Sequence, residues 1–231
     1  MKKSTRTVYF KNSNGLKLSN GNLKIGNDTL ILNMGAAYNC PSKRLGFCKL
    51  CKECYAYKAE IQYPSVKIYR KSQQMYWLKN SATVIFQDIE QILTTKKRRV
   101  NGKLQPLYKS IQYLRINESG DFWSQKCIYK LDFITTMLKS KYGIKTYTYT
   151  ARQDLDFRGV SFVVKGSSHR NGNNGMTIAR PFTDKQLEAF KDWKSLWIDD
   201  MQDYFTVCPM DCTKCNLCKV KNNINIVFPL H

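Results

Sequence analysis

Eight of the nine cysteines stand in two short groups, and this grouping limits what the 231-residue chain can fold into. The members are Cys40, Cys48, Cys51 and Cys54 in the first group and Cys208, Cys212, Cys215 and Cys218 in the second. A disulfide framework would scatter its cysteines, whereas each group supplies the four thiolates that a structural zinc ion or a [4Fe-4S] cluster needs. The sequence therefore predicts two metal-binding loops.

The spacing within both groups favours iron over zinc. A structural zinc site usually takes two ligands from each of two separated turns, whereas both groups contain a Cys-x-x-Cys-x-x-Cys run, as ferredoxin-type clusters do. We predict one or two [4Fe-4S] clusters and keep zinc as the alternative, because zinc also accepts four thiolates. His169 and His231 are left outside the predicted ligands, since eight thiolates are present.

The charge of the chain predicts a polyanionic partner. Lys and Arg number 38 against 17 Asp and Glu, which gives a formal charge of +21. Such a charge attracts nucleic acid without specifying which sequence is bound. The basic run Lys96, Lys97, Arg98 and Arg99 is the candidate contact. Its alternative role is to stabilise the C-terminal end of a predicted helix through the helix dipole.

The chain shows no signal for a membrane or for export. No apolar run approaches the roughly 18 to 20 residues that span a bilayer, and the first residues lack the apolar region of a signal peptide. We therefore expect a cytoplasmic location, where thiols stay reduced, and no membrane partner.

Hydrophobic periodicity predicts an α/β fold: a partly closed, mostly parallel (β/α) sheet or partial barrel with N-terminal hairpins and two cysteine-rich metal loops. We expect one domain over residues 1–231. Its parts are N-terminal β hairpins in 1–39, the first cysteine loop in 40–57, an α/β core in 58–207 and the C-terminal cysteine loop in 208–231. Asn-Gly pairs at 14–15 and 20–21 mark the hairpin turns.

The predicted core contains a βαβ unit with strands 111–116 and 146–150 around a helix over 124–141. Cys127 falls on the buried face of that helix and is expected to be a core residue. Two earlier helices are predicted to begin at Ser65 and near Ser81, and further strands at 160–164 and 176–179. Thr183 and Gln186 predict a capping box for a helix that carries Leu187, Phe190 and Trp193.

Polar residues gather where two predicted strands end. In a parallel sheet these ends lie together, and functional groups collect there. We predict catalytic roles for Glu118, Asp121 and Arg152, and cofactor binding by Asn117, Ser119, Thr148 and Thr150. The alternative is that Asn-Glu-Ser-Gly-Asp forms only a turn and a helix cap. The glycine-rich loop 165–175 could hold phosphate, but a surface loop is the favoured interpretation because no Walker or Gly-x-Gly-x-x-Gly pattern accompanies it.

Three segments carry a family resemblance: Cys40 to Glu60, Arg115 to Phe122, and Cys208 to Cys218 with the terminal His231. Over most of its length the chain resembles the phage gene product eighty-eight family, and it looks distantly like radical S-adenosylmethionine proteins. The resemblance implies a viral or mobile-element origin, a host-cytoplasmic location, iron rather than zinc, and S-adenosylmethionine as a further cofactor.

By analogy with the radical enzymes, Cys48, Cys51 and Cys54 would hold a cluster with one open iron, and Glu118 or Asp121 would receive the cofactor. The chain departs from that pattern because Cys40 could close the cluster. The Cys-x-x-x-Cys-x-x-Cys spacing also occurs at the C-terminal end instead, and the chain has fewer predicted strands than the usual barrel.

These features lead to three functional hypotheses. The first is an iron-sulfur protein of radical-enzyme-like architecture that acts on or binds nucleic acid. The second is a non-catalytic, zinc-stabilised nucleic-acid-binding module. The third is a small basic virus protein that binds a host protein.

Overall fold

The computed structural model describes residues 8–21, 24–170, 174–183, 186, 188 and 195–229. The strands of the main sheet are β1 (Tyr9–Lys11), β2 (Lys17–Asn20), β3 (Thr29–Leu32), β6 (Tyr113–Ile116), β7 (Lys145–Thr150), β8 (Val163–Ser167), β9 (Met176–Arg180), β10 (Ser195–Ile198), β11 (Asp203–Val207) and β12 (Asn225–Pro229). They form a ten-stranded sheet in the order β1-β2-β3-β6-β7-β8-β9-β12-β11-β10. A separate hairpin consists of β4 (Lys97–Val100) and β5 (Lys103–Pro106).

Every neighbouring pair from β3 to β11 is parallel. Antiparallel pairing is confined to the two ends of the sheet, where β1 pairs with β2, β2 with β3, and β10 with β11. The predicted mostly parallel α/β sheet and the N-terminal hairpin are thus confirmed. The sheet is open, with β1 and β10 as its edges among the strands described, so the expected partial closure into a barrel is not found.

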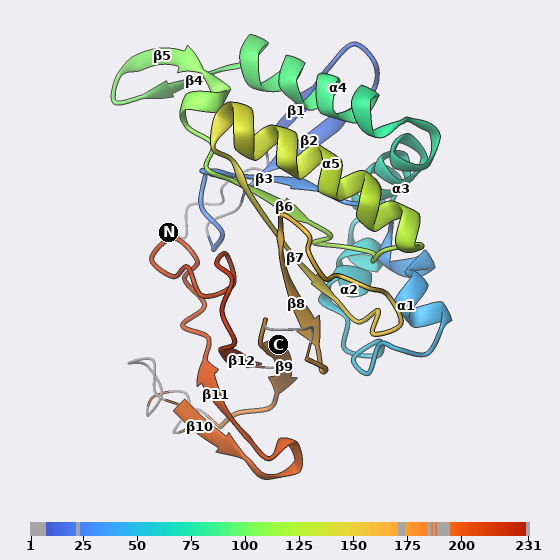
Figure 1. Ribbon diagram of the computed structural model, residues 1–231, viewed down its shortest axis with the longest axis vertical. Helices are drawn as coiled ribbons and strands as arrows, with labels where there is room; N and C mark the ends of the chain where they lie inside the picture. Colours follow the sequence, from blue (N-terminus) through green and yellow to red (C-terminus); the bar gives the residue numbers. More distant parts are fainter. Residues whose placement is uncertain are drawn as a thin grey trace.

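The α-helices are α1 (Pro41–Arg44), α2 (Tyr55–Gln62), α3 (Pro64–Lys79), α4 (Ala82–Thr95) and α5 (Gln125–Tyr142), and the 3-10 turns are η1 (Ala37–Asn39), η2 (Leu107–Lys109) and η3 (Asp199–Met201). Figure 1 shows α3, α4 and α5 gathered on one side of the sheet. Their apolar faces bury Leu30, Leu32, Leu114 and Ile116 of the strands in the main core. In the described ranges, no helix combines the length and the apolar character needed to cross a membrane.

The central βαβ unit follows directly from the sequence. The helix α5 buries Cys127, Ile128, Leu131, Ile134 and Leu138 at three- and four-residue spacing. It ends at Gly143, which adopts a left-handed conformation at φ +69° that glycine accommodates without strain. The helix returns the chain to β7, which pairs in parallel with β6. The predicted unit and the core position of Cys127 are both confirmed.

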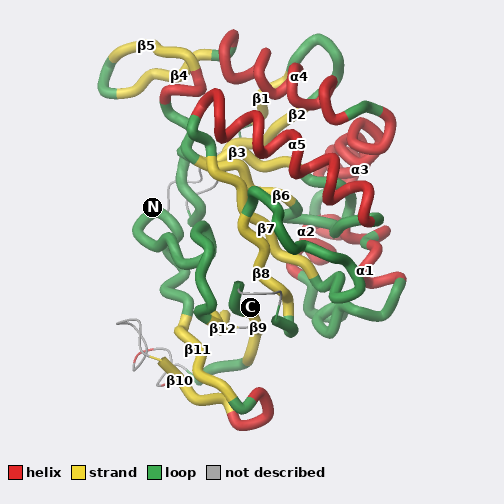
Figure 2. The backbone as a smooth tube through the Cα atoms, in the orientation of Figure 1, coloured by secondary structure: helices red, strands yellow, loops and turns green. Residues whose placement is uncertain are grey.

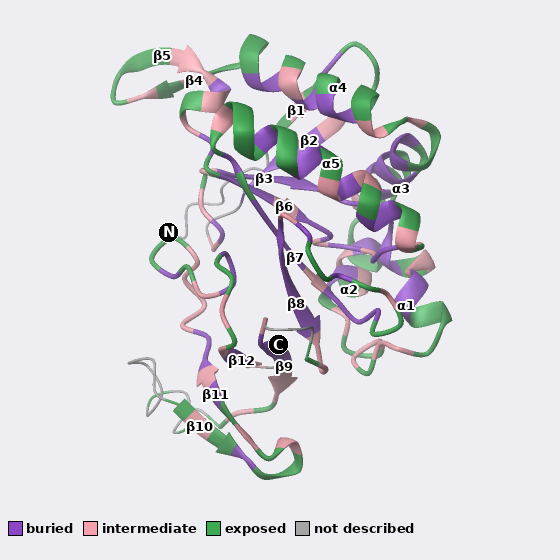
Figure 3. Cartoon of the chain, viewed as in Figure 1, coloured by how far each residue is buried: buried purple, intermediate pink, exposed green. Residues whose placement is uncertain are grey.

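The other face of the sheet carries large polar and aromatic side chains. Arg115 lies opposite Tyr147, and Tyr149 lies opposite Lys165, in the parallel register of β6, β7 and β8. This face is covered by residues 208–224, which form neither helix nor strand and appear as loop in Figure 2. Cys208, Cys218 and Ile226 pack there against Tyr149 and Phe228. Figure 3 shows the central strands β3, β6, β7 and β8 as largely buried.

Three predicted elements are placed differently. The helix α3 begins at Pro64, because proline suits the first helical turn. Its N-cap residue is therefore Tyr63 and not Ser65. β8 begins at Val163, three residues after the predicted start, and it continues through Lys165 and Gly166 to Ser167. Residues 225–229, predicted to be loop, form β12 between β9 and β11.

The basic run 96–99 follows α4 directly, as predicted. The helix α4 ends at Thr95 with Lys96 as its cap, and Lys97 to Val100 form β4, which turns into β5 at Asn101 and Gly102. Both turn residues have positive φ, 49° and 78°, as a tight hairpin turn requires. The run therefore stands at the helix C-terminus, and its last three residues belong to a hairpin that was not predicted.

The remaining sequence predictions fall partly outside the described residues. Thr183 and Gln186 form the predicted capping box, since the Thr183 amide donates to Gln186 Oε1 at 2.9 Å and the Gln186 amide donates to Thr183 Oγ1 at 3.3 Å. The three apolar residues predicted to follow them, Leu187, Phe190 and Trp193, lie outside the described residues, as does His231.

The loops after β3 and β6 cross at Gly35 and Gly120. Gly120 has φ +76°, and a Cβ there would lie 2.7 to 2.9 Å from the backbone of Gly35. Such distances are far below van der Waals contact, so no side chain fits between the two loops.

We expect Gly120→Ala to lower the free energy of unfolding by about 3 kcal/mol or more, because a left-handed strain and a backbone clash add together. Gly143→Ala is the matched control, since Gly143 has φ +69° with open space around its Cβ position. It should cost only about 1 kcal/mol. Urea unfolding of both variants measures the difference, and equal losses would show that the crossing of the loops is not tight.

Candidate functional site

The carboxyl ends of β3 and β6 are tied together by two asparagines. The Ser119 amide donates to Asn33 Oδ1 at 2.9 Å, and the Met34 amide donates to Asn117 Oδ1 at 2.9 Å. Asn117 adopts a left-handed backbone with φ +58°, which asparagine tolerates better than most residues. Asn117 and Ser119, both predicted to bind a cofactor, therefore hold the two strand ends in place.

Glu60 of α2 occupies the centre of this region. Its Oε1 accepts the Ala37 amide at 2.7 Å and the Ser119 hydroxyl at 3.1 Å, and its Oε2 accepts the Tyr38 amide at 3.1 Å. The guanidinium of Arg70 lies 3.2 Å from the same carboxylate, and both side chains are almost fully buried. Such a buried pair is stable only because these additional donors satisfy the carboxylate.

Asp121 is a second buried carboxylate with a full set of donors. It accepts the Ser42 hydroxyl at 2.5 Å, the Thr150 hydroxyl at 2.7 Å, the Ala151 amide at 2.9 Å and the Phe122 amide at 2.8 Å. Burial raises the pKa of Asp121, and these hydrogen bonds act against that shift. The predicted proximity of Asp121 and Thr150 is found, and Asp121 also fixes α1 beside them.

Arg152 and Thr148 likewise serve the framework. The Arg152 guanidinium donates to the Phe122 carbonyl at 2.5 Å and forms two 2.7 Å hydrogen bonds with Asp154. The Thr148 hydroxyl donates to the Ile116 carbonyl at 3.0 Å. The Thr148 hydroxyl and the Arg152 guanidinium are thus bonded to neighbouring residues, and their roles in cofactor binding and catalysis stay predictions.

Glu118 differs from the other predicted catalytic residues because its carboxylate is accessible. Its side chain is 22% exposed, and its Oε2 lies 3.8 Å from Arg70 Nη2. Its carbonyl accepts the Tyr55 hydroxyl at 2.7 Å. Among Glu118, Asp121 and Arg152, Glu118 is therefore the one placed to meet a ligand.

The first cysteine group surrounds α1 at this end of the sheet. The pKa of Cys40 is raised to about 12, chiefly by burial and in part by the charges of Asp121 and Cys54. Burial raises the pKa of Cys48 to about 12, with a hydrogen bond to Cys51 and the charge of Cys40 as added causes. The four thiols of this group are thus linked by electrostatic effects on one another's pKa, Cys40 with Cys54 and Cys48 with both Cys40 and Cys51.

The second cysteine group lies over the open face of the sheet. Burial raises the pKa of Cys218 to about 12 and that of Cys208 to about 11, and it also raises the pKa of Cys215. Each of these thiols is influenced by Cys212 as well. The loop is anchored by backbone bonds from Cys208 to Val227 and from Cys212 to Lys24, both 2.9 Å.

All nine cysteines lie in the described part of the chain, and none is disulfide-bonded. Each group of four offers the thiolate donors that iron or zinc accepts, so the donor chemistry fits a metal. Among the described residues, however, no three His, Cys, Asp or Glu side chains are already arranged to hold a metal ion. The two cysteine-rich metal loops therefore stay a prediction.

A chain of contacts crosses the sheet between the two groups. Tyr55, next to Cys54, receives a 3.3 Å hydrogen bond from Arg115, whose guanidinium lies 5.6 Å from the Tyr149 ring centre. The Tyr149 hydroxyl is in turn hydrogen-bonded to Cys218. The side chains of Tyr55, Arg115 and Tyr149 therefore connect the first cysteine group to the second.

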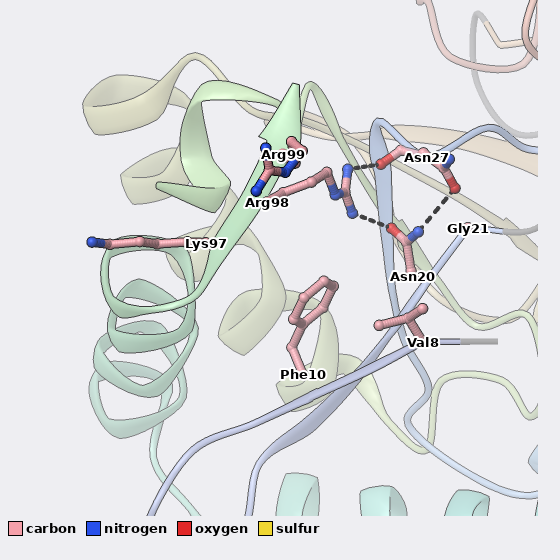
Figure 4. A pocket seen from close by; sticks show the side chains of 8 residues that line it. All are labelled: Val8, Phe10, Asn20, Gly21, Asn27, Lys97, Arg98 and Arg99. Atoms are coloured by element: carbon pink, nitrogen blue, oxygen red, sulfur yellow. Dashed lines mark hydrogen bonds between the residues drawn. The ribbon is translucent and has the colours of Figure 1, made fainter. Parts of the chain in front are cut away.

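The basic run divides into exposed and fixed residues. Lys96, Lys97 and Arg99 are exposed. Arg98 is half-buried, and its guanidinium donates to Asn20 Oδ1 at 2.7 Å and to the Asn27 carbonyl. Figure 4 shows Arg98 reaching towards these two residues. Arg98 is therefore a structural residue, and the other three are available for phosphate.

The loop 165–175, for which phosphate binding was the less favoured interpretation, begins within the sheet. Lys165 is fully buried in β8, where its ammonium donates to the Asn222 carbonyl at 2.9 Å and to the Asn222 side chain at 2.6 Å. The ring of His169 contacts the Ser167 carbonyl at 3.2 Å. Residues 171–173 of this loop lie outside the described residues.

Sequence reasoning missed Glu60 and Arg70. The partners of Glu60 are backbone amides and a hydroxyl that lie 22 to 59 positions away, so no local spacing identifies them. The one available signal is an acidic residue in a helix that directly follows a cysteine group.

We expect Glu60→Gln to lower the free energy of unfolding by about 3–5 kcal/mol, because it leaves Arg70 buried without its counter-ion. Glu118→Gln, which removes a partly exposed carboxylate beside the same arginine, should change it by less than about 1 kcal/mol. Chemical unfolding followed by circular dichroism compares the two, and a large loss in Glu118→Gln would show that this carboxylate is also structural.

Comparison with known proteins gives one match. No curated protein and no solved structure matches the chain. The profile of the family described as Gene product 88 matches residues 2–221, which is nearly the whole chain. The resemblance to the phage gene product family is thereby confirmed, while the resemblance to radical S-adenosylmethionine proteins stays a prediction. The chain belongs to the Gene product 88 family.

Proposed function

We propose that this protein binds iron-sulfur clusters through its two cysteine groups and binds nucleic acid through its basic surface. The observation that carries the first half is the grouping of the thiols: Cys40, Cys48, Cys51 and Cys54 interact around α1, and Cys208, Cys212, Cys215 and Cys218 interact over the sheet. The raised pKa of Cys40, Cys48, Cys208, Cys215 and Cys218 means that metal loading must release protons, as thiolate ligation generally does.

Iron is proposed over zinc because three thiolates per group fall in one short loop. The alternative is a zinc-stabilised module in which the same eight thiolates hold two zinc ions. In either case the metal would organise segments that have little regular structure of their own, since residues 45–54 and 208–224 contain no helix or strand.

We expect protein purified without oxygen to be brown and to contain iron and inorganic sulfide. Cys51→Ser or Cys215→Ser should lower the iron content and the unfolding temperature together, because metal free energy is folding free energy where the ligands organise a loop. Cys127→Ser is the control, since Cys127 lies in the core of α5 and should leave the iron-to-protein ratio unchanged. A colourless protein with about two zinc ions would favour the alternative.

An enzymatic role would depend on Cys40 and Glu118. If Cys48, Cys51 and Cys54 alone held the first cluster, one iron would stay open to S-adenosylmethionine, and Glu118, whose carbonyl accepts the hydroxyl of Tyr55 next to Cys54, would be the carboxylate to receive it. If Cys40 also bound, the cluster would be closed and would serve structure or electron transfer. Electron paramagnetic resonance with and without S-adenosylmethionine, in native and Cys40→Ser protein, separates the two cases.

The nucleic-acid half of the proposal rests on charge and its placement. Between Glu90 and Glu118 the sequence has seven Lys and Arg and no acidic residue. This segment includes the β4-β5 hairpin, on which Lys97 and Arg99 are exposed. A surface of this kind contacts phosphates and gives affinity without base specificity.

We expect the native protein to bind DNA and RNA of any sequence at low salt, with affinity that falls steeply as salt is raised. Replacing Lys96, Lys97 and Arg99 by Gln should weaken all sequences alike and reduce the salt slope by up to about 3, one unit for each lost phosphate contact. Arg98 is kept in this variant because it holds Asn20 and Asn27. Failure of the native protein to shift either nucleic acid would exclude this half of the proposal.

A further inference from the structure

A crevice of about 470 Å³ lies between the N-terminal hairpin and β4. Val8 and Phe10 form its apolar side, and Arg98 with Asn20 and Asn27 forms the facing side (Figure 4). The volume falls within the range of about 300–1,000 Å³ that small-ligand sites occupy. The crevice is therefore large enough for one flat aromatic group.

The two walls come from two segments of the chain that carry no negative charge. Residues 1–27 contain six Lys and Arg and no Asp or Glu, and residues 91–117 contain seven and none. The fold brings these segments together at the crevice, with Lys97 and Arg99 on its lining. Asp28 is the first acidic residue of the chain, and its charge raises the pKa of Arg98 against the larger lowering by burial. An anionic ligand is thus favoured over a cationic or neutral one.

Arg98 is held rigidly and forms part of the wall. Its guanidinium is bonded to Asn20 Oδ1 and to the Asn27 carbonyl, and it lies 5.8 Å from the centre of the Phe10 ring. The Asn20 amide in turn donates to Asn27 Oδ1 at 3.0 Å. Because both side-chain oxygens already accept hydrogen bonds, the wall offers flat surface more than base-specific hydrogen bonding.

We propose that this crevice accepts one unpaired base of a single-stranded nucleic acid, with Phe10 stacking on the base and Lys97 and Arg99 contacting the neighbouring phosphates. The inference rests on the proposed nucleic-acid binding and assigns it a site and a strand preference. An aromatic wall between cations is the combination by which proteins hold single strands, whereas bases inside a duplex are not free to enter. Little sequence preference is expected, since every base has a stacking face.

The test compares a labelled oligothymidylate of about 15 nucleotides, within the length that one such groove covers, with a duplex of the same length. Phe10→Leu keeps an apolar side chain and removes the aromatic face. It should weaken binding of the single strand by about tenfold and leave duplex binding unchanged within about twofold. Phe10→Tyr keeps the ring and should restore native affinity for the single strand.

A charge control separates stacking from general attraction. Lys71 and Lys126 are exposed on α3 and α5, so Lys71→Gln with Lys126→Gln removes the same charge as Lys97→Gln with Arg99→Gln. The crevice pair should lose more single-strand affinity than the helix pair. Circular dichroism and urea unfolding of Phe10→Leu show whether the hairpin is still folded, since Phe10 also packs against the main core.

The base-binding site is overturned if Phe10→Leu weakens binding of single strand and duplex equally. It is also overturned if neither Phe10→Leu nor Phe10→Tyr affects the binding of either. In both cases nucleic-acid binding itself stands. A native protein that binds neither oligonucleotide overturns the proposed nucleic-acid function. Selective loss for the single strand with recovery in Phe10→Tyr supports the site.

Discussion

The buried carboxylate of Glu60 holds the N-terminal half of the candidate site in place. It receives the amides of Ala37 and Tyr38, which start the segment leading to Cys40, and the hydroxyl of Ser119 at the end of β6. Arg70 neutralises it and also approaches Glu118. Since a buried charge must be compensated, α2, α3 and the two strand ends can only assemble together. The position of the first cysteine group relative to Glu118 therefore depends on this ion pair together with the hydrogen bonds from Ser42 to Asp121 and from Tyr55 to the Glu118 carbonyl.

The second cysteine group depends on a different constraint, the polar character of the sheet face that it covers. Lys165 is fully buried there, and burial lowers the pKa of its ammonium to about 8. The carbonyl and side chain of Asn222 satisfy that ammonium, and Lys219 lies 4.2 Å from the ring centre of Tyr113. The covering segment is thus held by specific polar contacts as well as by Cys208, Cys218 and Ile226. Metal binding by its thiolates would add to the contacts that already hold residues 208–224 on the sheet.

The sequence was informative where structure is local. The apolar spacing around Cys127, the Ser81 cap and the Thr183-Gln186 capping box predict elements that the structure contains. Prediction was weaker where pairing is distant: β12 pairs with β9 and β11, and nothing within residues 225–229 specifies those partners. The basic run 96–99 stands at the end of α4 as predicted, but the β4-β5 hairpin was not predicted, although Asn101-Gly102 is a turn signal. Within the site, the sequence identified the strand-end residues. It did not show that Glu118 is accessible and Asp121 buried, because residue type does not determine exposure.

The place of β12 in the sheet has a consequence for how the chain is made. β11 is synthesised before β12, yet its pairings are with β10 and β12, and β12 alone connects that pair to β9. Until β12 pairs with β9, the hairpin of β10 and β11 has no strand of the main sheet to join, and the second cysteine group lies between two unattached segments. The thiols of that group are therefore open to metal delivery until β12 takes its place in the sheet.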